Sequence, residues 1–196
     1  LASVQAAGEA ALSRPEPVGS ERSLVLVKPD NFQFPGIRPG AIMDVLARTG
    51  LNLVAMKVHR MSVAQGMEFY GPVLDVLAEK FGAQPGREHW EKIVEFMSGR
   101  KPSDVPEAEH GEPGTAKILA LVYEGPGAIG KIRAVLGPTD PAKAPPGTIR
   151  KEFGSNIMVN AAHASDSPDN ARREIGIVRV ADNPLKRFVE SAASAA

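Results

Sequence analysis

The residues best suited to do chemistry lie around one histidine, His163, in the run 160–168 (NAAHASDSP). Its neighbours are small, so a bulky polyanion has room to approach the ring. Ser167 and Pro168 are typical of a helix N-cap and first turn, and a helix that begins there favours negative charge nearby. Glu174 falls on that helix, where its carboxylate could fix the imidazole tautomer. From these residues alone, His163 is either a nucleophile or a purely structural histidine.

A second motif, Gly125–Lys131 (GPGAIGK), matches the phosphate-binding pattern G-x-x-x-x-G-K. It follows an apolar run and opens a helix, which is the context that this pattern needs. The match fails at its last position, because Ile132 replaces the Ser or Thr hydroxyl that would hold Mg²⁺. Pro126 also removes one backbone N–H donor from the expected cradle. We interpret the motif as a turn between strand and helix, and keep a P-loop ATPase as an alternative.

Composition narrows the class of protein. The chain has 196 residues, of which 43% are hydrophobic and 23% are charged, which favours one domain with a packed core. Lys+Arg 23 balances Asp+Glu 23, so the total charge does not indicate a nucleic-acid binder. The absence of cysteine excludes disulfides, thiolate metal sites and a cysteine nucleophile. No apolar run approaches the roughly 20 residues that a membrane span needs.

Strand and helix patterns alternate along the chain. Apolar runs predict strands at 23–27, 51–60, 118–123 and near 175–180. Helical spacing predicts helices at 39–49, 62–81, 88–98, 128–136 and 168–176, with a break or kink at Gly71-Pro72. The Pro-rich segments 99–115 and 137–148 read as loops. The two ends, 1–20 and 191–196, carry no strong pattern and read as loose extensions.

The segment around His163 resembles the active-site signature of nucleoside diphosphate kinases, N-x-x-H-G-S-D. Further blocks resemble those of the family in the same order: 21–30 (ERSLVLVKPD), 50–57 (GLNLVAMK), 136–141 (LGPTDP), 146–150 (PGTIR) and 171–175 (ARREI). The resemblance covers roughly residues 21–176 and is interrupted by extra length between about 78 and 115. Two departures are Ala164, where glycine is usual after the histidine, and Asn31, where glycine is common.

The resemblance implies an α/β (α+β) fold, a ferredoxin-like βαββαβ sandwich with an antiparallel sheet and a helical lid hairpin. It divides the chain into a flexible N-terminal extension (1–20), a kinase-like domain (21–182) with an expanded lid or loop at about 78–115, and a C-terminal tail (183–196). The implied activity moves the terminal phosphoryl group of a nucleoside triphosphate to a nucleoside diphosphate. It runs by ping-pong through a phosphohistidine at His163, with Mg²⁺ carried on nucleotide phosphates and no metal ligand from the protein.

The resemblance also assigns roles to other side chains. Those implied for catalysis beside His163 are Glu174 on the far ring nitrogen, Ser165 bonded to Glu174, Tyr70 near the nucleophile, and Lys28. Those implied for nucleotide binding are Lys28, Arg133 and Arg150 around the phosphates, Thr139 as a hydroxyl donor, Asn160 at the ribose and Trp90 under the base. His89 is a weaker candidate for the base and Phe81 is expected in the core. Each of these residues also has a purely structural interpretation.

The implied partners are nucleoside di- and triphosphates and further copies of the chain, in a dimer-based tetramer or hexamer. The resemblance implies a cytoplasmic protein with no membrane attachment and no specific nucleic acid. A competing hypothesis from another class is a nucleotide-binding or scaffold module of the same fold, in which the altered lid impairs turnover.

Overall fold

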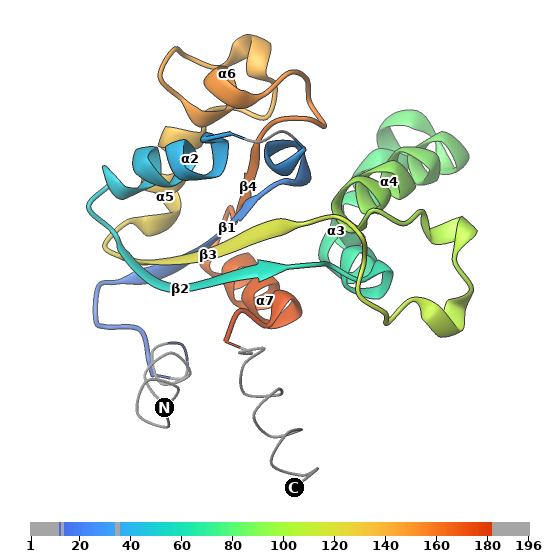
Figure 1. Cartoon of the computed structure of the whole chain (residues 1–196), viewed down its shortest axis with the longest axis horizontal. Coiled ribbons are helices and arrows are strands. Elements are labelled where there is room, and N and C mark those ends of the chain that lie inside the picture. The colour runs from blue at the N-terminus through green and yellow to red at the C-terminus, as the bar shows by residue number, and fades with distance from the viewer. Residues whose placement is uncertain (1–11, 13, 34–35, 182–196) are drawn as a thin grey trace, which may run out of the picture.

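The computed structural model describes residue 12, residues 14–33 and residues 36–181 of the chain. Its centre is a four-stranded sheet in the order β2-β3-β1-β4, in which every neighbouring pair is antiparallel (Figure 1). The strands are β1 (Glu21–Val27), β2 (Asn52–His59), β3 (Ile118–Gly125) and β4 (Ala162–Ala164). This order confirms the predicted ferredoxin-like sandwich.

The helices lie on both faces of the sheet (Figure 1). The longer ones are α2 (Arg38–Ala47), α3 (Val63–Phe81), α4 (Ala83–Ser98), α5 (Ala128–Leu136) and α7 (Pro168–Val178). The shorter ones are η1 (Pro29–Phe32), η2 (Pro102–Asp104), η3 (Glu107–Glu109), η4 (Pro141–Lys143) and α6 (Ile149–Phe153). α2 and α5 make the two crossovers of the sandwich, and α3 with α4 forms the predicted hairpin between β2 and β3.

Strand β1 divides the core into two layers. Val25 and Val27 pack with side chains of α2 and α5, whereas Leu24 and Leu26 pack with side chains of α3, α4 and α7. All four are fully buried. A strand covered on both faces needs apolar residues at successive positions, which explains the continuous run in the sequence.

The fourth strand is not where the sequence predicted it. The strand expected near 175–180 is wrong, because Ile175–Val178 completes α7 and the helix ends at Arg179 with φ +50°. The apolar pair Ile177 and Val178 is buried on one side of that helix. The fourth strand is the three-residue β4, which has His163 at its centre.

The hairpin α3–α4 is more regular than expected. Ser62 and Gln65 form a reciprocal capping box at the start of α3. The helix then runs unbroken through Pro72, so the predicted break is absent. α4 begins at Ala83, five residues before the predicted start. The following segment, predicted as a loop, contains η2 and η3.

The segment before β1 is tied to the sheet by a buried ion pair. Arg22 Nε lies 2.9 Å from Glu124 Oε2, and Arg14 lies 2.6 Å from the other oxygen of Glu124. Arg22 also donates to the backbone carbonyls of Leu12 and Arg14. The expected flexible extension is therefore anchored from Leu12 onward over its described part. The remaining terminal residues of both predicted extensions, 1–11, 13 and 183–196, lie outside the described residues.

Within the described residues, the structure contains no helix long and apolar enough to cross a membrane.

Candidate active site

His163 and Glu174 meet at the centre of the candidate site. The Nε2 atom of His163 lies 3.0 Å from Oε2 of Glu174, and Ser165 Oγ donates a 2.6 Å hydrogen bond to the same oxygen. Glu174 is buried, while the side chain of His163 is 23% exposed. Because a carboxylate accepts hydrogen bonds, Nε2 carries the ring hydrogen, which leaves the lone pair of a neutral imidazole on Nδ1. The arrangement therefore presents a nucleophile backed by a negative charge.

Two local features bring these three side chains together. Ser165 N donates to the carbonyl of Leu24, and Leu24 N donates to Ser165 Oγ, so the residue is fixed to β1 from both sides. Ser167 then caps α7 by accepting from Asn170 N, which sets the direction of the helix. Glu174 lies on the buried face of α7 and points back to β4.

The approach to β4 passes through a backbone conformation that is unusual for a residue with a side chain. Ala161 has φ +68°, which costs roughly 1–2 kcal/mol for an L-residue. Its carbonyl accepts from Lys28 N at 2.9 Å and from Asn31 Nδ2 at 2.8 Å, and its N–H donates to Asp30 Oδ2 at 3.2 Å. Asp30 and Asn31 are therefore positioning residues whose roles the sequence reasoning did not identify, although Asp30 ends the VKPD block and Asn31 follows it.

Lys28 lies between β1 and the segment that leads into β4. Its Nζ donates to Asn160 Oδ1 at 2.7 Å and to the carbonyl of Met158 at 3.2 Å. Asn160 in turn donates to the carbonyl of Thr139 at 3.0 Å. Burial, reinforced by the positive charge of Arg150, lowers the pKa of Lys28 to about 8. At pH 7 the Lys28 side chain therefore remains mostly protonated, and its positive charge faces two uncharged oxygen acceptors.

Arg150 is held beside strand β4 by two hydrogen bonds to backbone carbonyls. Its guanidinium donates to the carbonyl of Ala162 at 3.1 Å and to that of Gly137 at 2.9 Å. Burial and then the charge of Arg133 lower the pKa of Arg150 to about 10, so it stays charged at neutral pH. Its Nε is buried without a partner in the described part of the protein. Arg133 and Thr139 are exposed at the rim of this region.

Two rings of α3 pack against the histidine. The ring centroid of Phe69 lies 5.1 Å from that of His163, and the centroid of Tyr70 lies 6.3 Å away, both in edge-to-face geometry. Burial and the nearby charge of Glu174 raise the pKa of Tyr70, so its hydroxyl remains a donor. Among the described residues, that buried hydroxyl has no hydrogen-bond partner. Phe69 was not anticipated from the sequence, since its helical spacing is that of a core residue.

The structure does not support Trp90 as the residue that stacks on a base. Trp90 is 4% exposed, and its indole N–H donates to the carbonyl of Tyr70. Phe81, which was expected in the core, is 45% exposed and stacks on His89 with centroids 4.9 Å apart. The role at the base came from the resemblance, whereas the helical spacing of Trp90 placed it on the apolar stripe that the structure buries. The sequence reasoning also missed Phe96, whose ring centroid lies 5.8 Å from Lys28 Nζ.

The GPGAIGK motif does not present a free helix N-terminus. In the structure it forms the turn between β3 and α5, and Ile129 N donates to the carboxylate of Glu21 at 2.9 Å. A negative side chain thus occupies the position that a phosphate would take. Lys131 is exposed.

A further question is whether the side chains of the protein could bind a metal ion directly. The described residues include no group of three or more His, Asp or Glu side chains placed to hold an ion.

Fold and site together define a class of α/β sandwich protein in which a carboxylate-backed histidine lies beside buried cations. The family model described as nucleoside diphosphate kinase matches residues 21–182. The chain therefore belongs to the nucleoside diphosphate kinase family.

Individual relatives agree with this assignment. A nucleoside diphosphate kinase of Staphylothermus marinus is 33% identical over 164 residues, covering 82% of this chain and 94% of that protein. One from Symbiobacterium thermophilum is 36% identical over 155 residues, covering 79% and 84%. Among solved structures, the Aquifex aeolicus nucleoside diphosphate kinase superposes with a TM-score of 0.62 at 31% identity, covering 85% of this chain and 97% of that one.

Proposed function

We propose that this protein transfers the terminal phosphoryl group of a nucleoside triphosphate to a nucleoside diphosphate through a phosphohistidine at His163. Membership of the family supports the reaction, and one observation carries the assignment of the residue. Glu174 Oε2 accepts from Nε2 of His163 at 3.0 Å and from Ser165 at 2.6 Å. This contact orients the ring and leaves Nδ1 as the attacking atom.

The first half-reaction forms a bond between His163 Nδ1 and the γ-phosphorus while the bond from that phosphorus to the bridging oxygen breaks. The electron pair leaves with the nucleoside diphosphate. The imidazole becomes cationic as it accepts the phosphoryl group, and the negative charge of Glu174 stabilises it. A second nucleoside diphosphate then attacks the phosphohistidine and restores the neutral ring.

The cations of the site match the needs of this transfer, which depends mainly on positioning and electrostatics. Lys28 and Arg150 are fixed by hydrogen bonds to backbone carbonyls beside β4, and each retains donor capacity for phosphate oxygens. Arg133 and Thr139 at the rim, and Asn160 beside Lys28, complete the proposed contacts to phosphate and ribose. Mg²⁺ enters as part of the nucleotide substrate.

We assign the base contact to the end of the α3–α4 hairpin instead of to Trp90. His89 is exposed and stacked on Phe81, so the pair offers an aromatic surface that the buried indole of Trp90 lacks. The intact contact between His163 and Glu174 argues against the competing hypothesis of a scaffold without turnover.

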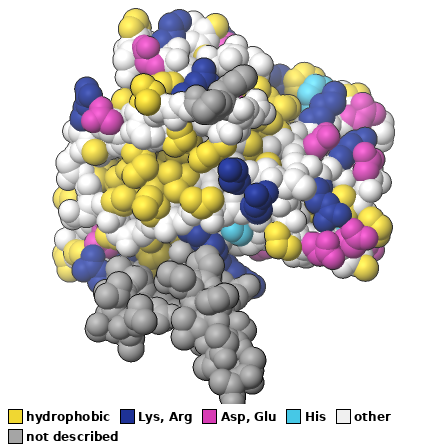
Figure 2. All heavy atoms as spheres, in the orientation of Figure 1, with side chains coloured by type: hydrophobic (Ala, Val, Ile, Leu, Met, Phe, Trp, Pro, Cys, Tyr) yellow, Lys and Arg dark blue, Asp and Glu magenta, His cyan; other side chains and the backbone are white. Residues whose placement is uncertain are grey.

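We also propose that the chain forms homo-oligomers, built from dimers, in the cytoplasm. The support comes from the edge strand β2, where Leu53, Met56 and Val58 are 42%, 57% and 61% exposed. Figure 2 shows hydrophobic side chains gathered on the front of the molecule, where β2 lies. An apolar edge strand is a common surface for association.

The decisive experiment incubates the protein with ATP labelled on its γ-phosphate. We expect an acid-labile, base-stable label that disappears when a nucleoside diphosphate is added, because a phosphorus–nitrogen bond has this stability and can be discharged to an acceptor. His163→Ala should abolish the label. Lys131→Ala should retain it, whereas a P-loop ATPase would show the reverse. Full labelling of His163→Ala would refute the assignment.

A further inference from the structure

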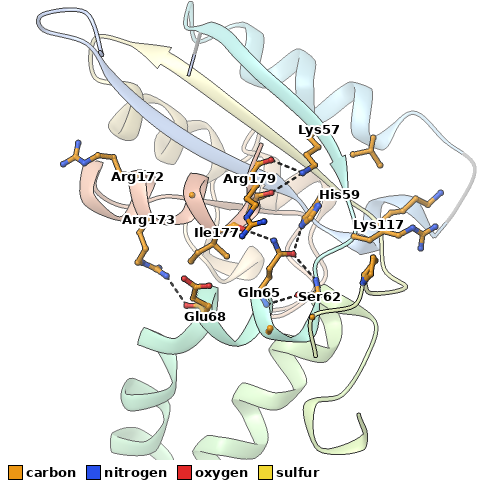
Figure 3. A pocket seen from close by; sticks show the side chains of 17 residues that line it. Lys57, His59, Ser62, Gln65, Glu68, Lys117, Arg172, Arg173, Ile177 and Arg179 are labelled. Carbon is orange, nitrogen blue, oxygen red and sulfur yellow. Dashed lines mark hydrogen bonds between the residues drawn. The ribbon is translucent and has the colours of Figure 1, made fainter. Parts of the chain in front are cut away.

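A hollow lies between the end of β2, the start of α3 and α7 (Figure 3). Its volume is about 1160 Å³. None of the residues proposed above for phosphoryl transfer lines it. The hollow is therefore distinct from the nucleotide site, although its lining shares Val58 of β2 with the proposed assembly surface.

The lining of this hollow is strongly cationic. Six lining residues are Lys or Arg and one is acidic, Glu68. The six are Lys57, Arg60, Lys117, Arg172, Arg173 and Arg179. The whole chain has equal numbers of basic and acidic residues, so its composition does not account for this concentration. Like charges held in one place repel one another, and a bound polyanion would relieve that repulsion.

Helix α7 contributes to both sites. Glu174 is buried on the side of the catalytic histidine, whereas Val178 is buried in the core and also lines the hollow. Arg172, Gly176 and Arg179 follow at helical spacing on the side of the hollow. A side chain at Gly176 would project into open space, so its absence leaves the wall between the two arginines open.

The cations differ in how they are engaged. Arg173 donates to the carbonyls of Glu68 and Phe69 and lies 3.7 Å from Glu174, and Arg60 donates to the carbonyl of Thr115. Lys57 donates to the carbonyl of Arg179 at 2.9 Å, and Arg172 pairs with Asp169 at 2.5 Å. Within the described residues, Arg60, Lys117 and Arg179 form no salt bridge with a carboxylate. These three supply charge that the described chain does not neutralise.

The inner wall of the hollow is polar and rigid. The side-chain oxygen of Gln65 lies 2.9 Å from His59 Nε2 and accepts from Ser62 N, while the Gln65 amide donates to the carbonyl of Ile177 at 2.7 Å. In Figure 3, Arg172 lies toward one end of the hollow and Lys117 toward the other, with Arg179 between them. The cations are thus spread along the hollow instead of converging on a single point.

We propose that this hollow binds a small phosphorylated molecule that carries at least two phosphate groups. The number of cations exceeds what one phosphate can neutralise, and their spacing along the hollow suits an extended anion. The volume is ample for such a ligand. The ligand is a second one, distinct from the substrate at His163.

The test titrates the full-length protein calorimetrically with inorganic tripolyphosphate at low salt. We expect two molecules bound per wild-type chain, one at the nucleotide site and one in the hollow. Lys117→Ala/Arg179→Ala should bind the molecule in the hollow about tenfold or more weakly and leave the affinity of the nucleotide site unchanged, since each charged hydrogen bond lost weakens binding by this order. Phosphoryl exchange should be unchanged, which shows that the variant is folded.

The matched control is Arg87→Ala/Lys92→Ala, which removes two exposed cations from α4 and should keep both sites. One molecule bound per wild-type chain would overturn the proposal, as would a second site that the double substitution leaves intact. Equal binding of inorganic monophosphate in the hollow would also overturn it, as would binding of a single-stranded oligonucleotide there without tripolyphosphate. Labelling of His163 is independent of all these outcomes, so failure here does not touch the proposed function.

Discussion

Glu174 Oε2 accepts hydrogen bonds from two different side chains, His163 and Ser165. The Ser165 hydroxyl holds the carboxylate in place, and the carboxylate holds the ring. A buried charge with two donors is a strong constraint on geometry. The orientation of the nucleophile therefore depends on a chain of contacts that starts at β1, where Ser165 is anchored to Leu24.

Replacing Glu174 by Gln should slow phosphorylation of His163 by roughly 10–100-fold, because a charge-assisted hydrogen bond contributes about 1.5–3 kcal/mol. The amide can still accept from the ring, but it does not stabilise the imidazole as it becomes positive. Rapid-quench measurement of label appearing on the histidine tests this. Glu79→Gln, on the exposed face of α3, is the matched control and should not change the rate. A Glu174→Gln rate equal to the wild type would contradict the proposed role.

The lowered pKa of Lys28 gives the reaction a pH dependence. In the free protein this lysine loses its charge as pH rises through about 8, so kcat/KM for nucleotide should fall across that region. Lys28→Arg should move the fall to higher pH, because guanidinium keeps its proton there. Lys131→Arg, at an exposed position, should leave the profile unchanged. A flat profile up to pH 9 for the wild type would rule the effect out.

The same shift has a consequence for stability. The pKa of Lys28 in the folded state lies below its ordinary value of 10.5, so between about pH 8 and 10.5 the unfolded chain binds more protons. The contribution of Lys28 to the free energy of unfolding should therefore increase with pH in this window, and is lost as pH falls through about 8.

At the scale of single residues, the sequence predicted the residues proposed for catalysis better than the residues that position them. His163, Glu174 and Ser165 lie in a motif whose spacing carries their relation, and the structure brings them together. Asn31 gives no comparable signal, because its contact with Ala161 joins segments that are 130 residues apart. The prediction that Trp90 contacts the base is not supported, because it rested on the resemblance, whereas the spacing of Trp90 along its helix agrees with the burial that the structure has.

Among the elements, the hairpin of α3 and α4 depends on a close backbone contact. A Cβ added at Gly86 would lie 2.6 Å from the backbone of Ala78. No side chain fits at that distance without moving one helix. Gly130 of α5, in contrast, has open space around the position of a Cβ.

Gly86→Ala should therefore lower the free energy of unfolding by about 1–3 kcal/mol and raise KM for nucleotide, because the proposed base contact lies on this hairpin. Gly130→Ala should be neutral or stabilise by up to about 1 kcal/mol, because alanine is the better helix former. Urea denaturation of both variants gives the comparison. Equal stability of Gly86→Ala and Gly130→Ala would show that the contact is unimportant.

Most helices and strands were predictable because their hydrophobic patterns extend over many residues. The helix at 128–136 was predicted with the bounds that the structure has. β4 was not, since its three residues are too few to show an alternation. The end of α7 was misread for a related reason, because a pair of β-branched residues fits either a strand or one buried side of a helix.

For the whole molecule, the exposed edge of β2 predicts the oligomeric behaviour. Val58→Lys should shift the protein to a smaller species in sedimentation velocity, because a charge is unfavourable in an apolar contact. Val76→Lys is the matched control, since Val76 on α3 is equally exposed at 61% but lies away from the edge. A wild-type protein that sediments as a monomer would contradict the proposed assembly.

The distribution of charge over the surface was the property that the sequence predicted least well. A balance of 23 basic and 23 acidic residues indicates a surface of mixed sign. The structure nevertheless gathers six cations in one hollow, because α7, β2 and the segment before β3 each contribute some of them. Residues this far apart in sequence meet only through the fold, so no count along the chain could have located the hollow.

The sheet order β2-β3-β1-β4 places the apolar strand and the strand of His163 at opposite edges. Two copies joined through β2 would each keep an entire reaction centre of their own, with three strands between it and the junction. We expect such subunits to turn over independently, so that joining them prolongs the life of the folded chain without altering the rate of each catalyst.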